Sequence, residues 1–533
     1  MTQNIQYPIG IQTFDKIIEG GYIYVDKTSL IHDLVNSNKY VFLSRPRRFG
    51  KSLLISTIEA YFHGRKDLFK GLAMENLEHK WEEHPVLRFD LSGESYQHSG
   101  KLKNLLNLLL SEYEAIYGKN PEEKDLATRF RGIIKRAHDI SGKDVVVLID
   151  EYDKPMVDNI HDDSLVDDFR KELRGFYGVL KGSDPYIHFA MLTGVTKYSH
   201  VSIFSGLNNL KDVSMNPKYN AICGVSESEF RKYFGPSIEN FAEANGWAVE
   251  SVWNVFKAKY DGYHFCGKGE GIYNPFSILW AFDDNKLGDY WFRSGTPDLI
   301  TKVLRKNNYN LSNIEGGEFT ETQLSDLVDP NKDYHALFFQ AGYLTVKGYK
   351  PATLNPVTFA DTPEKFILGF PNREVSTGFW SSLYSNYLFS DRPATPFDET
   401  GFITAVETGH PEDFMNRLGA LLSELSQGNT PKDNVRLKEI NFQNDLQIIF
   451  RMLGFHVNTE ITVASGRIDM IVETSSFVYL FEFKVNSTPE AAIQQIKDNL
   501  YAAKFASDPR RVFLIGANFS SKTNTLTSSI AEK

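Results

Sequence analysis

Two short stretches of the 533-residue sequence, far apart along the chain, carry side chains suited to chemistry on phosphate groups. The first reads Ser-Arg-Pro-Arg-Arg-Phe-Gly-Lys-Ser over residues 44–52 and follows an apolar run. A loop between a strand and a helix offers backbone N–H groups and the positive helix end to phosphate oxygens. In this pattern Lys51 would reach the β- and γ-phosphates of a nucleotide, and the Ser52 hydroxyl would bind Mg²⁺.

The loop departs from the usual phosphate-binding pattern at its first position. The pattern begins with glycine, which allows a tight turn at no steric cost, but Arg45 stands there. Arg48 and Gly50 complete the loop, and we count them with Lys51 and Ser52 as nucleotide-binding candidates. The alternative is an ordinary strand–turn–helix junction with a solvated basic loop.

A pair of carboxylates supports the nucleotide interpretation. Residues 145–149 form an uninterrupted apolar run, which Asp150 and Glu151 follow directly. Asp150 would hold Mg²⁺, often through water, and Glu151 would polarise the attacking water. Thr193, at the end of another apolar run, would sense the γ-phosphate. The alternatives are a helix cap for the acidic pair and an ordinary strand-end hydroxyl for Thr193.

The second stretch lies near the C-terminus. Asp469 stands in one predicted strand, and Glu482-Phe483-Lys484 closes the next. Because side chains alternate along a strand, Glu482 and Lys484 point to one face and Phe483 points to the core. A turn at residues 474–476 would bring Asp469 beside Glu482, and two such carboxylates suit Mg²⁺ or Mn²⁺. Lys484 would help to activate a metal-bound water or stabilise charge on a phosphate.

Other residues around this pair are weaker candidates. Glu439, on a predicted helix before the strands, would complete the metal site or hold a second ion, and Glu460 is a further acidic candidate. Gln494 or Gln495 and Tyr501 would contact a substrate backbone from the following helix. The alternative is a solvated ladder in which Glu482 and Lys484 are ordinary cross-strand neighbours.

These side chains require particular elements to position them. The N-terminal third alternates strand-like runs with helical stretches, which predicts a parallel sheet covered by helices. The predicted strands are Tyr40–Leu43, Val86–Leu91, Val145–Ile149 and His188–Thr193, and the helices include Leu53–Phe62 and Lys101–Tyr117. We expect a P-loop domain over residues 1–225 and a mostly helical middle domain over residues 226–390. Linker helices and a second α/β domain would occupy residues 391–533.

The C-terminal part reads as helix, strand pair, strand, helix and strand. The predicted helices are Phe397–Leu425, Leu437–Leu453 and Pro489–Ala506, and the predicted strands are Val457–Val463, Arg467–Glu473, Phe477–Phe483 and Arg511–Gly516. Breaks are expected at residues 391–396 and 427–431, where proline, glycine and asparagine are frequent.

Composition narrows the classes of protein. The net charge of −10 repels nucleic acid, so any nucleic-acid site must be a local basic patch. Two cysteines exclude a disulfide scaffold or a cysteine zinc cluster. The sequence has no signal-peptide pattern and no apolar run near the roughly 20 residues that span a membrane. We expect a cytoplasmic protein without a membrane partner.

Taken together, the motifs resemble the bacterial AAA-ATPase-like proteins that carry a C-terminal PD-(D/E)XK nuclease-superfamily domain. The resemblance covers nearly the whole chain and rests on the segments 24–28 (YVDKT), 45–52 (RPRRFGKS), 149–153 (IDEYD), 193–195 (TGV), 260–265 (YDGYHF), 371–375 (PNREV) and 481–484 (FEFK). It implies that the missing loop glycine is a property of the family. It also implies a restriction-endonuclease-like C-terminal fold, with Asp469, Glu482 and Lys484 as the nuclease positions.

The leading hypothesis is an ATP-regulated nuclease. ATP and Mg²⁺ would bind through Lys51, Ser52 and Asp150, the middle domain would transmit the nucleotide state, and the C-terminal domain would cut DNA or alternatively RNA. The first rival is a nucleotide-switched binding protein that does not cut. A second rival keeps the nuclease without ATP turnover. A homo-oligomer is compatible with either hypothesis, but the sequence does not require one.

Overall fold

The computed structural model describes residues 5–160, 162–197, 203–204, 209–294, 304, 309–325, 334–356, 361–388, 397–424, 435–463, 466–520, 522–523 and 525–533. The predicted breaks at residues 391–396 and 427–431 lie outside these ranges. The chain divides into two compact units. The first comprises Met1–Gly295 and Gly317–Glu374, and the second comprises Thr296–Gly316 and Val375–Lys533.

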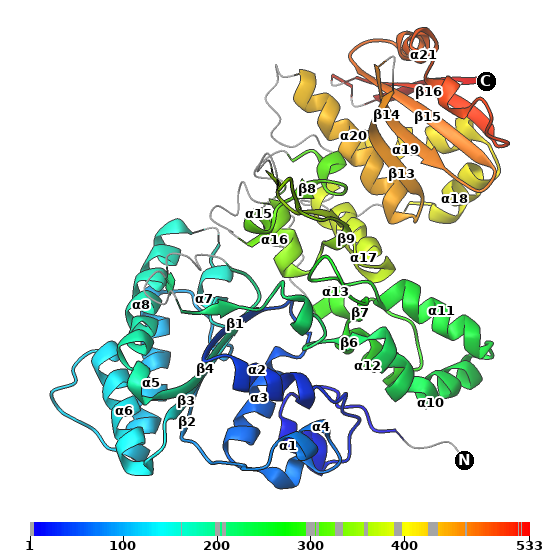
Figure 1. Cartoon of the computed structure of the whole chain (residues 1–533). Helices are drawn as coiled ribbons and strands as arrows, with labels where there is room; N and C mark the ends of the chain where they lie inside the picture. The colour runs from blue at the N-terminus through cyan, green and yellow to red at the C-terminus, as the bar shows by residue number, and fades with distance from the viewer. Residues whose placement is uncertain are drawn as a thin grey trace. The chain divides into compact units, whose positions relative to one another are not determined.

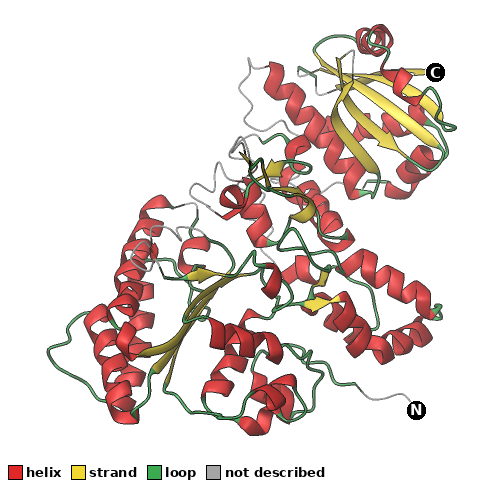
Figure 2. Ribbon diagram, in the orientation of Figure 1, coloured by secondary structure: helices red, strands yellow, loops and turns green. Residues whose placement is uncertain are grey.

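A five-stranded parallel sheet lies at the centre of the first unit, in the order β2-β3-β4-β1-β5 (Figure 2). Its strands are β1 (Tyr40–Ser44), β2 (Val86–Asp90), β3 (Val145–Asp150), β4 (Ile187–Gly194) and β5 (Lys211–Asp212). Every residue of β1 and β3 is buried, as expected for strands covered on both faces. The strand order brings the carboxyl ends of β1, β4 and β3 together at one edge.

Helices cover both faces of this sheet. Figure 1 shows α5, α6 and α8 grouped on one side and the segment from α1 to α4 on the other. The helices are α1 (Phe14–Glu19), α2 (Thr28–Ser37), α3 (Lys51–Phe62), α4 (Ala73–Leu77), α5 (Ser99–Tyr117), α6 (Leu126–Ser141), α7 (Lys154–Val157) and α8 (Asp163–Gly182). The predicted alternation of strands and helices is confirmed.

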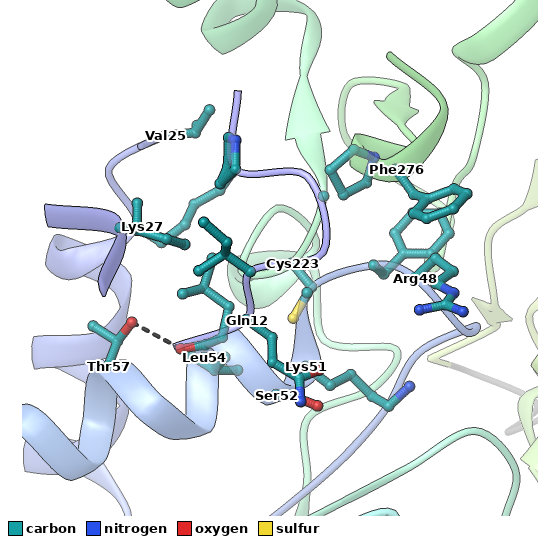
Figure 3. Close-up of a pocket in the computed structure, with 18 of the residues that line it drawn as sticks. Gln12, Val25, Lys27, Arg48, Lys51, Ser52, Leu54, Thr57, Cys223 and Phe276 are labelled. Atoms are coloured by element: carbon teal, nitrogen blue, oxygen red, sulfur yellow. Dashed lines mark hydrogen bonds between the residues drawn. The ribbon is translucent and has the colours of Figure 1, made fainter. Parts of the chain in front are cut away.

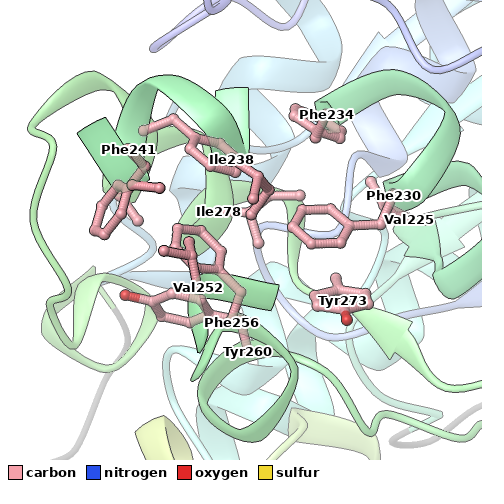
Figure 4. Close-up of a cluster of buried hydrophobic side chains, with 13 residues drawn as sticks. Val225, Phe230, Phe234, Ile238, Phe241, Val252, Phe256, Tyr260, Tyr273 and Ile278 are labelled. Atoms are coloured by element: carbon pink, nitrogen blue, oxygen red, sulfur yellow. The ribbon is translucent and has the colours of Figure 1, made fainter. Parts of the chain in front are cut away.

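Helices of the middle segment pack around a cluster of aromatic side chains (Figure 4). Phe230, Phe234 and Phe256 stack near Phe282, with ring centroids 4.7–6.1 Å from it. The cluster lies among α10 (Glu227–Asn245), α11 (Val249–Tyr260) and α12 (Pro275–Asp283), and the segment also contains α13 (Tyr290–Ser294), α15 (Glu321–Ser325) and α16 (Tyr334–Ala341). This stacking explains the aromatic richness of the segment as core packing.

The middle segment also contains strands that the sequence analysis did not predict. β8 (Glu318–Phe319), β12 (Lys365–Gly369) and β9 (Thr345–Lys350) form an antiparallel sheet in that order. Two small ladders join β6 (Val225–Ser226) to β7 (Ile272–Tyr273) and β10 (Thr353–Leu354) to β11 (Asp361–Thr362). They are two residues long and polar in part, so they carry little periodic signal.

The second unit is built on another five-stranded sheet, with α21 on one face and α20 and α19 on the other. Its pairings are antiparallel except between β15 and β16, which α21 connects. The elements are α17 (Arg373–Leu383), α18 (Glu399–Glu407), α19 (Pro411–Glu424), α20 (Val435–Met452), β13 (His456–Val463), β14 (Gly466–Glu473), β15 (Phe477–Val485), α21 (Pro489–Asp498), β16 (Arg511–Ser520) and β17 (Thr525–Glu532).

Two predicted helices of this unit had the wrong extent, and one strand was not predicted. The helix expected over residues 397–425 is two helices, because the chain turns at Gly409, whose φ is +77°. The helix expected over residues 489–506 ends at Asp498, and Leu500, with a φ of +49°, caps a short 3₁₀ helix over Tyr501–Phe505. The final strand β17 was not predicted, because its threonines and serines give it a polar, half-exposed surface.

Candidate nucleotide site and candidate nuclease site

The loop between β1 and α3 has the tight backbone of a phosphate-binding loop. Arg48 and Gly50 both have left-handed backbone, with φ of +69° and +91°, and Gly50 caps the N-terminus of α3. The Lys51 ammonium lies 3.1 Å from the Arg45 carbonyl oxygen and 3.3 Å from Glu151 Oε1. The loop carbonyls and Glu151 thus hold the Lys51 ammonium at the position where it would contact a bound phosphate.

Arg45 replaces the first glycine of the loop without disturbing it, because its side chain points away into the protein. The guanidinium donates hydrogen bonds to the carbonyl oxygens of Ser44, Ser214 and Tyr219 at 2.7–3.0 Å. It also lies 4.1 Å from the centroid of the Phe265 ring. Burial lowers the pKa of Arg45 to about 10. Arg45 therefore ties the loop to the segments that carry Ser214, Tyr219 and Phe265.

The acidic pair lies beside the loop, at the end of β3. Asp150 is fully buried, and its Oδ1 accepts hydrogen bonds from Thr193 Oγ1 at 2.6 Å and from the Glu151 backbone N–H at 3.1 Å. Its Oδ2 has no hydrogen-bond partner within the described residues. Burial and the Glu151 charge raise the pKa of Asp150, while the Ser52 and Thr193 hydroxyls and the Lys51 charge act in the opposite direction. The Asp150 Oδ2 atom, near the Ser52 hydroxyl, is therefore suited to bind a divalent cation.

Two features near this pair were not found from the sequence. Glu151 has left-handed backbone, with a φ of +55°, which is a strained conformation for a non-glycine residue. Asp153 accepts hydrogen bonds from the backbone of Val195 and from both the backbone and the hydroxyl of Thr196. Burial raises the pKa of Asp153. Asp153 thus fixes the chain just after Thr193, and the segment 149–153 was its only sequence signal.

A cavity of about 530 Å³ opens in front of the loop. Figure 3 shows Arg48 next to Phe276 on one side and Val25 and Lys27 on the other. Lys51, Ser52 and Glu151 line its polar part, whereas Ile11, Val25, Phe276 and Leu279 are among its apolar residues. A volume of this size, with polar groups at one part of an apolar wall, suits a small molecule that carries phosphates. Ile11, Phe276 and Leu279 belong to no motif and therefore could not be recognised from the sequence.

In the second unit, the neighbouring strands β14 and β15 carry the predicted carboxylates opposite each other. Asp469 and Glu482 lie one position beyond the ladder pair Met470–Phe481, and Asp469 Oδ2 accepts a 2.8 Å hydrogen bond from the Phe483 backbone N–H. Lys484 Nζ lies 3.0 Å from Glu482 Oε1. Glu482 and Phe483 are buried, while Asp469 and Lys484 are half-buried. The turn at residues 474–476 closes with a hydrogen bond from Thr474 N to Phe477 O.

None of the weaker candidates Glu439, Glu460 and Tyr501 has a described side-chain contact with Asp469 or Glu482. Glu439 is in the first turns of α20, and its side chain is not among those described. Glu460 pairs with Arg467 and has a φ of +55°. Tyr501 is buried in the core, where its hydroxyl accepts a hydrogen bond from Asn499. Gln443, which the sequence analysis did not single out, donates to the Asp469 carbonyl at 2.9 Å and ties α20 to the site.

Two further observations concern metal-ligand clusters and membrane-spanning helices. Among the described side chains, no group of three or more histidines, cysteines, aspartates or glutamates is arranged to hold a metal ion. Asp469 and Glu482 are oxygen donors on neighbouring strands, so they fit a hard cation that completes its shell with water and substrate. Within the same described ranges, every helix is too short or too polar to cross a bilayer.

Comparisons with known proteins identify a family for each of the two segments that carry these candidate sites. A family model described as a predicted AAA-ATPase matches residues 8–204, and a model of the PD-(D/E)XK nuclease superfamily matches residues 437–529. A relative from Azotobacter chroococcum mcd 1, named "Uncharacterized protein in vnfD 5'region", is 34% identical over an alignment of 532 residues that covers 98% of each chain. The chain therefore belongs to the family of AAA-ATPase-like proteins with a C-terminal PD-(D/E)XK nuclease-superfamily domain.

Proposed function

We propose that this chain binds and hydrolyses ATP with Mg²⁺ at the loop of the first unit, and that nucleotide occupancy regulates cutting of DNA by the second unit. The observation that carries the nucleotide part is the convergence of Lys51, Glu151 and the buried Asp150 at one side of the cavity. The observation that carries the nuclease part is the approach of Asp469 to the Glu482–Lys484 segment of strand β15. Both substrates imply a cytoplasmic protein.

The residues of the first unit would act as follows. Lys51 exchanges the loop carbonyls and Glu151 for β- and γ-phosphate oxygens. Glu151 is thereby freed to accept a proton from the attacking water. Asp150 and Ser52 would hold Mg²⁺ and its water, Thr193 would sense the γ-phosphate, and the ion would neutralise charge on the phosphates.

At the second site, the protein's own contribution is positioning. The Phe483 N–H fixes the Asp469 carboxylate, and the Gln443 amide holds the backbone beneath it. Asp469 and Glu482 would bind Mg²⁺ or Mn²⁺, which would polarise the phosphodiester and the attacking water. Lys484 would leave Glu482 to face the negative charge that develops on the phosphate.

Titration calorimetry of the purified chain with ATP·Mg²⁺ tests the first part. We expect wild type to bind and Lys51→Ala to lose about tenfold or more in affinity, because a buried cation that faces the phosphates is removed. Lys143→Ala is the matched control, since Lys143 is exposed and pairs with Glu82 away from the cavity. Equal affinities for wild type and Lys51→Ala would refute nucleotide binding at this loop.

Cleavage assays test the second part on linear, nicked and single-stranded DNA and on RNA, with Mg²⁺ or Mn²⁺ and with or without ATP. We expect wild type to cut at least one DNA substrate and Asp469→Asn to be inactive. Intact substrates under all conditions would refute the nuclease.

The rival function is binding of nucleic acid without cutting, switched by nucleotide. It is favoured by the finding that no third acidic side chain joins Asp469 and Glu482 among the described residues. Nucleic-acid binding that is indifferent to Asp469→Asn, in the absence of cleavage, would support this rival.

A further inference from the structure

Glu374 is a buried carboxylate of the first unit. It is the last residue of the first unit, and the chain enters the second unit at Val375, within α17. Its carboxylate accepts hydrogen bonds from Ser277 Oγ at 2.8 and 3.0 Å and from the Trp291 backbone N–H at 2.8 Å. No cation forms an ion pair with it in the described part of the chain. Such a residue is costly to bury, so its position calls for a reason.

The residues that bind Glu374 also reach the phosphate loop. Trp291 Nε1 donates a 3.0 Å hydrogen bond to the Arg47 carbonyl oxygen. Phe276, the neighbour of Ser277 on α12, has its ring 5.0 Å from the Arg48 guanidinium. Two consecutive loop residues, Arg47 and Arg48, are therefore linked to the same carboxylate through two separate helices.

Close packing leaves this part of the loop little freedom to move alone. A Cβ on Gly342 would lie 2.6 Å from Pro46 and 3.4 Å from the Trp291 ring, and the φ of Gly342 is +89°. Trp291 also packs edge-on against Tyr343, with centroids 5.3 Å apart. Because packed interiors yield in steps rather than smoothly, a shift of the Arg47 carbonyl must displace Trp291.

We propose that Trp291, Ser277 and Glu374 pass the nucleotide state of the phosphate loop to α17, where the chain enters the nuclease-bearing unit. This inference rests on the proposed nucleotide binding. When phosphates draw Lys51 away from the Arg45 and Pro46 carbonyls, the following residues Arg47 and Arg48 shift with them. Trp291 and Phe276 then move against Glu374. The order or position of α17 changes as a result.

Hydrogen exchange of the full chain, measured on the α17 amides of residues 376–383 with and without ATP·Mg²⁺, tests this proposal. We expect ATP·Mg²⁺ to change the wild-type exchange rates by about fivefold or more, in the usual range of coupling between sites. Trp291→Phe keeps an aromatic ring but loses the Nε1 donor, so it should still bind ATP·Mg²⁺ while its α17 response falls by at least half. Glu374→Gln, which keeps the side-chain shape, should weaken the response in the same way.

Trp247→Phe is the matched control. Trp247 follows α10, is 44% exposed and packs against Phe241 rather than against the residues of the proposed path. It should respond to ATP·Mg²⁺ as wild type does. Wild type that binds ATP with unchanged α17 exchange, or variants that both respond fully, would overturn the inference. Absence of ATP binding to wild type would instead refute the proposed function on which the inference rests.

Discussion

Both candidate sites combine a lysine with acidic side chains, but the lysine and its neighbouring aspartate are buried in the first unit and partly exposed in the second. In the first unit, the Lys51 side chain is 3% exposed and contacts a loop carbonyl and Glu151, which follows β3, beside a fully buried Asp150. In the second unit, the Lys484 side chain is 27% exposed and pairs with Glu482, two residues away on the same strand, beside a half-buried Asp469. An enclosed site suits a small nucleotide, whereas an open one leaves room for a polymer backbone.

The largest expected effect sharpens this contrast at the open site. Lys484→Ala should lower the cleavage rate by about 10²–10³-fold, because it removes a cation that faces the developing charge. ATP affinity should not change. Cleavage time courses and titration calorimetry on the same preparation measure both. Lys497→Ala, on the exposed side of α21, is the control. Wild-type cleavage by Lys484→Ala would show that Lys484 has no part in the reaction.

Arg45→Gly tests whether the hydrogen bonds of Arg45 support the loop of the enclosed site. The substitution restores the usual loop glycine, yet we expect it to destabilise the first unit by about 2–4 kcal/mol, because three buried carbonyls lose their donor. Nucleotide affinity should fall rather than rise. Chemical denaturation and ATP titration check the two effects. A more stable variant with tighter binding would show that Arg45 is a defect of the loop.

Glu374 predicts a pH dependence that the open site does not share. Burial raises its pKa from 4.5 to about 7, so between these values the folded state binds more protons than the unfolded state. Stability from this group therefore falls as pH rises from 4.5 to 7 and stays low above. Relative to Glu374→Gln, wild type should lose about 3 kcal/mol over this range. Chemical denaturation at pH 5 and pH 8 measures this loss. The same difference in unfolding free energy between wild type and Glu374→Gln at both pH values would contradict the prediction.

The smallest expected effect separates stability from function at Asp150. Because burial raises the pKa of its carboxyl, Asp150→Asn should raise the melting temperature at neutral pH by about 2–4 °C. The same change should slow ATP hydrolysis at least tenfold by weakening the cation site. Calorimetry and a phosphate-release assay measure these outcomes. A variant that is destabilised yet hydrolyses ATP normally would argue against a cation at Asp150.

The sequence predicted the parts of each site that depend on local spacing. Strand alternation places Glu482 and Lys484 on one face, and an apolar run ending in Asp150 marks a buried strand. It did not predict the role of Arg45, because the carbonyl groups of Ser214 and Tyr219 reach it only through the tertiary fold. Glu374 was missed as a site for the same reason. Leu500 was missed as a break because nothing in its side chain favours left-handed backbone.

The most direct test of the account is a DNA cleavage time course for the full chain and for Lys51→Ala, with Mg²⁺, in the presence and absence of ATP. The account predicts that ATP changes the wild-type rate and leaves the rate of Lys51→Ala unchanged. Cleavage by neither protein, or the same response to ATP in both, would contradict it.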